Sequence, residues 1–175
     1  MSRVPASLDP QQPRVQQREF VMDALVAGDL PRLRAESLEG HPLHVAARFE
    51  IRRGALGELR LSGTIEGELW HECQRCLQPM AWHFRLTPDA VLVPLEGSIE
   101  GLDAGDDFVE LDVEGLLRPR DWVEEEVLLA WPLVPRHEDC NTGRTDEFAE
   151  GEGRENPFAV LAGLKDDLAG RGDDS

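Results

Sequence analysis

"PLHVAARFEIRR", residues 42–53, decides the fold class of this chain. Every second position in it is apolar, and the set is Leu43, Val45, Ala47, Phe49 and Ile51. A period of two places these side chains on one face of a β-strand and the intervening side chains on the other. The stretch therefore predicts a strand with one buried face and one solvent-exposed face.

The sequence around this strand predicts more strands of the same kind. They are expected over residues 59–69, 80–86, 90–95 and 108–113. Gly63 and Gly67 interrupt the first of them and mark places for a bend or a bulge. Strands so close in sequence usually pair antiparallel, so the sequence favours a meander or a barrel-like sheet.

Helices are predicted on either side of the strand-rich region. Residues 18–27 are ambiguous between strand and helix, whereas residues 28–40 predict a short helix with Asp29 as a candidate cap. The main helix begins near Pro119 and ends before Pro132. The fold class expected is α+β: an antiparallel sheet of four to five strands, one main covering helix, and a flexible acidic C-terminal region.

The composition divides the chain into five parts. We expect an extended or disordered N-terminus over residues 1–17 and the α+β domain over 18–135. An acidic linker (136–155), a short amphipathic helix (156–165) and a disordered tail (166–175) are predicted to follow. Phe158, Leu161 and Leu164 would form the apolar face of that short helix.

The charge of the chain is unevenly distributed. It holds 18 basic and 35 acidic residues, for a net charge of −17, and residues 94–175 alone hold seven basic and 23 acidic ones. Such an acidic half argues against a broad nucleic-acid footprint and suits contact with a basic protein, although it can also serve solubility alone. The N-terminal sequence has no apolar signal-peptide core, and three cysteines do not form a disulfide framework, so we predict a cytoplasmic protein with no membrane contact.

Cys73 and Cys76 form a Cys-x-x-Cys pair between two predicted strands, at the end of a hairpin. This position disfavours a thioredoxin-type redox pair, which needs a helix N-terminus to lower the pKa of a thiol. The spacing is typical of half a zinc site, and His137 with Cys140 could supply the other half. His71 is a less suitable ligand. The sequence alone favours inert thiols over this zinc site.

A known family shares several of these stretches. They are "SLDP" (7–10), "ECQRCLQPM" (72–80), "VEEEVLLAWPLVPRHEDC" (123–140) and "ENPFAVLAGLK" (155–165). In this order they resemble the bacterial YceD proteins, the large ribosomal RNA subunit accumulation protein family, from Ala6 to Lys165. The resemblance implies a role in the synthesis, processing or stability of 23S ribosomal RNA and in large-subunit assembly. It supplies no catalytic residues.

Two binding functions remain open at this point. In the first, the protein is a non-enzymatic factor that holds a ribosomal protein or a maturation factor of ribosomal RNA. Its candidate contact residues are Glu124, Glu125, Glu126, Phe158, Leu161 and Leu164, although the glutamates are also typical of a solvated helix face. In the second, ribosomal RNA binds directly to arginines on the exposed sheet face: Arg48, Arg52, Arg53 and Arg60.

An enzyme is the least favoured class. A metal nuclease needs carboxylates clustered on ordered elements, whereas the acids here concentrate in loops, in the tail and on one helix face. Cys73 and His71 are close in sequence, but nothing supplies an orienting third group or an oxyanion hole. We therefore expect no small-molecule substrate.

Overall fold

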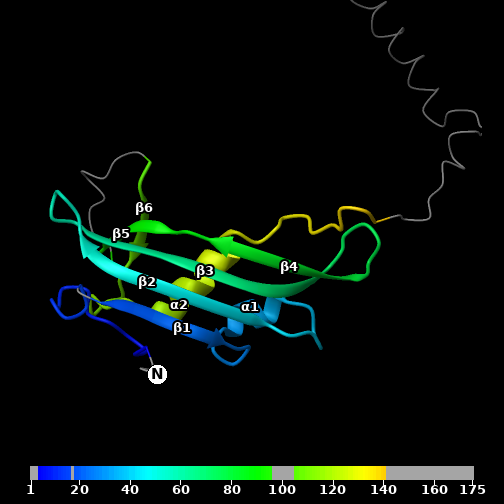
Figure 1. Ribbon diagram of the computed structural model, residues 1–175, viewed down its shortest axis with the longest axis horizontal. Coiled ribbons are helices and arrows are strands. Elements are labelled where there is room, and N and C mark those ends of the chain that lie inside the picture. Colours follow the sequence, from blue (N-terminus) through cyan, green and yellow to red (C-terminus); the bar gives the residue numbers. More distant parts are fainter. Residues whose placement is uncertain (1–3, 17, 96–104, 141–175) are drawn as a thin grey trace, which may run out of the picture. The chain divides into compact units, whose positions relative to one another are not determined.

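A computed structural model describes residues 4–16, 18–95 and 105–140 (Figure 1). The chain divides into two compact units, Met1–Cys140 and Asn141–Ser175, and every described residue belongs to the first. The short helix predicted over 156–165, with Phe158, Leu161 and Leu164, lies outside the described residues. Neither helix in the described part is long and apolar enough to cross a membrane.

The described elements follow one another as β1 (Glu19–Leu25), α1 (Pro31–Glu36), β2 (His44–Arg53), β3 (Leu59–Glu72), β4 (Pro79–Leu86), β5 (Asp89–Val93), β6 (Asp107–Glu110) and α2 (Pro119–Leu129). The ambiguous stretch 18–27 therefore forms a strand. The predicted strands over 42–53, 59–69 and 80–86 are confirmed. The main helix begins at Pro119, as predicted, because the missing N–H of proline costs little in a first turn.

The strands form one open sheet in the order β1-β2-β3-β5-β6, with β4 also paired to β3. The described residues thus contain six strands in place of the four to five expected. All pairs are antiparallel except β5–β6, which is parallel and corrects the expected meander. A parallel pair needs a long connection between its two strands, and 13 residues separate the end of β5 from the start of β6.

Strand β3 is long enough to carry two partners on one edge. Its 14 residues pair with β5 near their start, where Leu61 faces Ala90, and with β4 further on, where Leu69 faces Trp82. The β3–β4 hairpin consequently lies at one end of the sheet (Figure 1). The pairing of β2 with β3 runs without a register shift through Gly63 and Gly67, so the bulge predicted there is not present.

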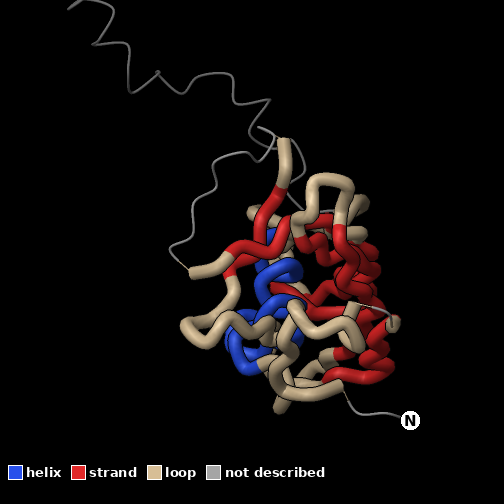
Figure 2. Tube along the Cα trace, turned by 90° about the vertical axis from the view of Figure 1, so that its left-hand side faces the viewer, coloured by secondary structure: helices blue, strands red, loops and turns tan. Residues whose placement is uncertain are grey.

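One face of the sheet carries the core, and both helices lie on that face (Figure 2). The Phe49 ring lies at its centre, stacked on Phe20 at 5.1 Å and edge-on to Trp122 of α2 at 5.3 Å. Residues 4–16 pack against this core. Composition had predicted an extended or disordered segment there. Leu8 exchanges two backbone hydrogen bonds of 2.8 Å with Leu117, and its side chain is buried.

A buried carboxylate joins the two helices. Glu124 of α2 is only 4% exposed, and its Oε1 atom accepts hydrogen bonds from the backbone N–H groups of Arg32 (2.5 Å) and Leu33 (3.0 Å) in α1. The expected cap, Asp29, pairs instead with Arg120 at 3.3 Å. Glu124 therefore does not lie on a solvated helix face, because the free N–H groups of α1 need an acceptor there.

Candidate metal centre

The turn between β3 and β4 fixes the position of the first two thiols. Cys73 closes the turn twice: its N–H donates to the Gln78 carbonyl at 3.0 Å, and its own carbonyl accepts the Leu77 N–H at 2.9 Å. Leu77 has a positive φ of 58°, which lets the chain reverse within four residues. The turn therefore brings Cys73 and Cys76 close together at the end of the sheet.

The loop that follows α2 delivers the other two candidate ligands. After Ala130 it runs alongside β4 to the β3–β4 turn (Figure 1). The Gln74 N–H donates to the carbonyl of Pro135 at 2.8 Å, which attaches the loop to the turn. The ordered chain consequently continues past 135, the predicted end of the domain, and includes His137 and buried Cys140.

An aromatic cluster anchors the same loop upstream of its ligands. Trp131 lies edge-on to His71 at 4.4 Å and to Trp82 at 5.9 Å, so it packs between β3 and β4. His71 is 4% exposed, its Nε2 atom has no hydrogen-bond partner among the described residues, and burial lowers its pKa. His71 is thus a neutral member of this cluster and is not part of the ligand group.

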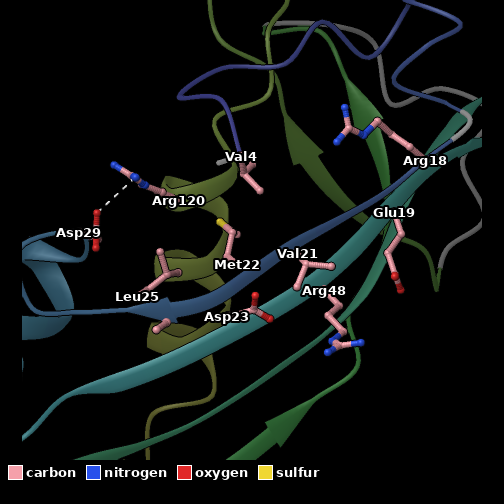
Figure 3. A pocket seen from close by; sticks show the side chains of 11 residues that line it. Val4, Arg18, Glu19, Val21, Met22, Asp23, Leu25, Asp29, Arg48 and Arg120 are labelled. Carbon is pink, nitrogen blue, oxygen red and sulfur yellow. Dashed lines mark ion pairs between the residues drawn. The ribbon is translucent and has the colours of Figure 1, made fainter. Parts of the chain in front are cut away.

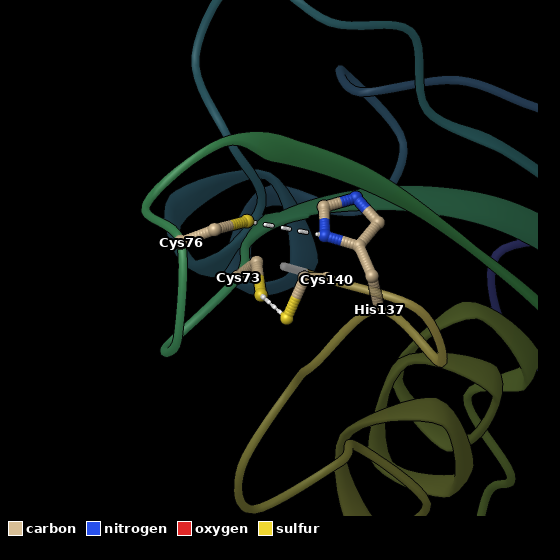
Figure 4. Close-up of side chains that lie close together, drawn as sticks. All are labelled: Cys73, Cys76, His137 and Cys140. Carbon is tan, nitrogen blue, oxygen red and sulfur yellow. Dashed lines mark hydrogen bonds between the residues drawn. The ribbon is translucent and has the colours of Figure 1, made fainter. Parts of the chain in front are cut away.

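The side chains of Cys73, Cys76, His137 and Cys140 converge on one point (Figure 4). Their four ligand atoms all lie within 4.8 Å of one another. The Sγ atoms of Cys73 and Cys140 are 3.8 Å apart, and Cys76 Sγ lies 3.4 Å from His137 Nδ1. No other group of three or more potential metal ligands of this kind is present in the part of the chain that the structure describes.

The sulfur–sulfur and sulfur–nitrogen contact distances match those in a tetrahedral zinc site. With zinc–sulfur bonds of about 2.3 Å and a zinc–nitrogen bond of about 2.0 Å, two sulfur ligands lie about 3.8 Å apart and a sulfur and a nitrogen about 3.5 Å apart. All three cysteines are free, so none is used in a disulfide. Three thiols and one imidazole are a common donor set for structural zinc.

The electrostatics of the cluster also favour a cation. Burial pushes the pKa of Cys73 up, but backbone N–H groups of Cys76, Arg75 and His137 and the Cys76 side chain outweigh it and lower the pKa to about 5. Burial, followed by the neighbouring Cys73 and Cys76, raises the pKa of Cys140. One thiolate thus forms readily, while a second requires a positive charge between them.

The arginines proposed for RNA binding lie on the exposed sheet face or at its margins, but acidic residues neutralise much of their charge. Arg52 pairs with Glu50 at 2.6 Å, and Arg60 pairs with Asp89 at 3.0 Å and with Asp106 at 3.1 Å. The remaining two differ: Arg53 donates to the Gly57 carbonyl, and Arg48 has no ion pair among the described residues. Such ion pairs leave little positive field for a phosphate backbone.

A hollow of about 690 Å³ lies beside β1 (Figure 3). Val4 and Arg120 lie on one side of β1 in that view, and Glu19 and Arg48 on the other. Three arginines and three acidic residues line it, and one pair of them, Arg120 with Asp29, forms a salt bridge. The lining contains no cysteine, serine or histidine that could act as a nucleophile or base.

The fold and the site together define a small α+β domain whose last loop meets a hairpin at a Cys₃His cluster. The family described as "Large ribosomal RNA subunit accumulation protein YceD" matches residues 61–165. A curated relative of that name from Haemophilus influenzae is 30% identical over 126 residues, which cover 60% of this chain and 64% of the relative. No solved structure is significantly similar to the chain.

The chain belongs to the YceD family, so the family predicted from the quoted stretches is confirmed. The family name connects its members with accumulation of the large ribosomal RNA subunit. The aligned region spans just under two thirds of the curated relative. All four clustered ligands lie in stretches that carried the resemblance: Cys73 and Cys76 in 72–80, and His137 and Cys140 in 123–140.

Proposed function

We propose that this protein is a cytoplasmic, non-enzymatic factor that supports the synthesis, processing or stability of 23S ribosomal RNA and the assembly of the large ribosomal subunit. Membership of the YceD family carries this proposal. The net charge of −17 supports action through a basic protein partner, because so acidic a chain repels the phosphates of RNA. The neutralised arginines of the sheet face make direct RNA binding the weaker alternative.

A complementation experiment tests the role in ribosomal RNA. In a bacterium that lacks its own YceD gene, expression of this chain should restore the ratio of 23S to 16S ribosomal RNA and the yield of large subunits. An unchanged ratio, with the protein present at normal levels, would contradict the proposal. A second measurement addresses the partner: a protein partner should stay bound after ribonuclease treatment, whereas steep weakening of RNA-fragment binding with salt would favour the RNA alternative.

We also propose that Cys73, Cys76, His137 and Cys140 bind one zinc ion with a structural role. Four protein ligands fill a tetrahedral site and leave no open position for a substrate or a reactive water. The ligands come in pairs from the β3–β4 turn and from the loop after α2. Zinc would therefore connect the loop after α2 to the β3–β4 hairpin, as structural zinc ions connect separate segments in other proteins.

Elemental analysis of protein purified without chelators tests this zinc site. We expect about one zinc per chain in the wild type and a large loss in Cys76→Ser and His137→Ala. His83→Ala is the matched control, since the His83 side chain is 72% exposed and lies outside the cluster. Replacement by Co²⁺ should give the absorption bands of a tetrahedral thiolate site. Absence of both metal and Co²⁺ bands in the wild type would overturn the proposal.

A further inference from the structure

Two adjoining hollows form one groove beside α2, which we call the β6–α2 groove. The first, of about 490 Å³, lies between β6, the turn after it and α2; the second, of about 630 Å³, continues from β6 toward the β4–β5 connection. Phe108 of β6 and Glu126 and Leu129 of α2 line both. The two hollows thus adjoin along one side of α2, and no residue of the Cys₃His cluster lines either of them.

Large apolar side chains lie open to solvent in this groove. Phe108 is 49% exposed, Leu129 is 75% exposed, and Leu95 at one end is 43% exposed. Single exposed apolar residues are common, but three that line one hollow form a surface whose burial would be favourable. The apolar part of the groove therefore suits apolar anchors of a partner.

The charged groups around these apolar residues are mostly acidic. Asp107, Glu110 and Glu126 have no salt bridge within the described ranges. The two basic residues that line the groove are already used: Arg118 pairs with Asp112 at 3.0 Å, and Arg85 pairs with Glu66 at 2.8 Å. The charge left for a partner is consequently negative.

Glu126 shows that this negative charge is crowded. Its carboxylate accepts the Trp122 indole N–H at 3.0 Å inside the groove. Burial is the largest cause of its raised pKa, the Trp122 hydrogen bond opposes it, and the nearby charges of Asp107 and Glu125 add to it. A cation placed between these carboxylates would relieve both the repulsion and the burial cost.

We propose that the β6–α2 groove docks a basic amphipathic segment of a partner protein, with apolar side chains on Phe108 and Leu129 and lysine or arginine near Asp107 and Glu126. The proposal rests on the proposed function, in which the partner is a basic protein, and adds the surface that binds it. Charge complementarity identifies the occupant. RNA and a second copy of this chain carry the wrong charge, and so do residues 141–175, which hold four basic and nine acidic residues.

Titration of the full chain with a fluorescent synthetic peptide tests the groove. The probe is an amphipathic peptide of lysine and leucine, and its matched control has glutamate in place of every lysine. We expect the lysine peptide to bind and the glutamate peptide not to bind. Asp107→Asn with Glu110→Gln should weaken binding by about tenfold, as should Leu129→Ala alone. Glu36→Gln with Glu39→Gln, which removes two exposed charges elsewhere, should leave it unchanged.

Several results would overturn the groove proposal: equal binding by the groove variants and the wild type, stronger binding of an RNA fragment, or a self-association that Leu129→Ala abolishes.

Failure of the proposed function is a separate result. If the chain does not restore the RNA ratio but binds the peptide through these residues, only the ribosomal role is wrong. If the groove variants restore the RNA ratio and also bind peptide normally, only the groove is wrong.

Discussion

Glu124 has a structural role that the two glutamates after it do not share. Its buried Oε1 atom satisfies two backbone N–H groups of α1. We predict that Glu124→Ala lowers the free energy of unfolding by about 2–4 kcal/mol, because both donors lose a charged acceptor in a site from which water is excluded. Urea denaturation measures this change.

Glu125→Ala is the matched control for that substitution. Glu125 is next in sequence and pairs with Arg32 at 2.6 Å, but both side chains are more than half exposed. Exposed ion pairs contribute at most about 1 kcal/mol, so its removal should have a small effect. Equal losses in the two variants would contradict the capping role of Glu124. A run of three glutamates does not reveal which one is buried, because that depends on where α1 packs against α2.

Glu126 leads to a prediction about pH. Its folded-state pKa is raised above the ordinary value, chiefly by burial, so the ionised carboxylate destabilises the fold. The protonated form of Glu126 is therefore the one that favours the fold. Its contribution to stability is fully present at pH values below the unfolded-state pKa, and it is lost as the pH rises through the folded-state pKa. Glu126→Gln should therefore be more stable than the wild type at pH 7, and the two should converge below about pH 4. Thermal unfolding across this pH range measures the difference, and a constant gap at all pH values would contradict it.

Within single elements, Gly63 of β3 gives the sharpest test of the sheet. A Cβ atom at this position would collide with the backbone carbonyl of Arg48 and would lie 2.9 Å from the Phe49 Cβ. Neither neighbour can move without shifting β2, so Gly63→Ala should cost about 1–3 kcal/mol in urea unfolding. Gly28→Ala should cost nothing, because no atom lies within 4 Å of a Cβ there and its φ is not positive.

The same strands show what periodicity can predict. Alternation over 42–53 correctly identified both the strand and its buried face, because the period follows directly from which face is covered. The sequence marked Gly63 and Gly67 of β3 as special positions but predicted a bend or a bulge there. In the structure the backbone of β2 lies too close to both positions for a side chain, and the sequence does not reveal that distance. The parallel β5–β6 pair was missed for a related reason: the alternation in a strand is the same whichever way its partner runs.

For the whole molecule, the Cys₃His cluster depends on contacts between segments far apart in the chain. The sequence grouped Cys73 and Cys76 with His137 and Cys140, because Cys140 is the only other thiol and two-residue spacers allow both side chains of a pair to reach one ion. The sequence favoured inert thiols, since it does not reveal that the loop after α2 returns along β4. That return depends on Trp131 packing against His71 and Trp82.

Removal of the proposed zinc ion should therefore release this loop without unfolding the sheet. The Gln74 N–H, which donates to the Pro135 carbonyl at 2.8 Å, should lose most of its protection from hydrogen exchange when a chelator is added. Amides in the centre of β2, such as that of Phe49, should keep theirs, because the core around Phe49 does not include the cluster. Cys76→Ser should reproduce the effect without chelator. Unchanged exchange at Gln74 in metal-free protein would show that the hairpin and the loop hold together without an ion.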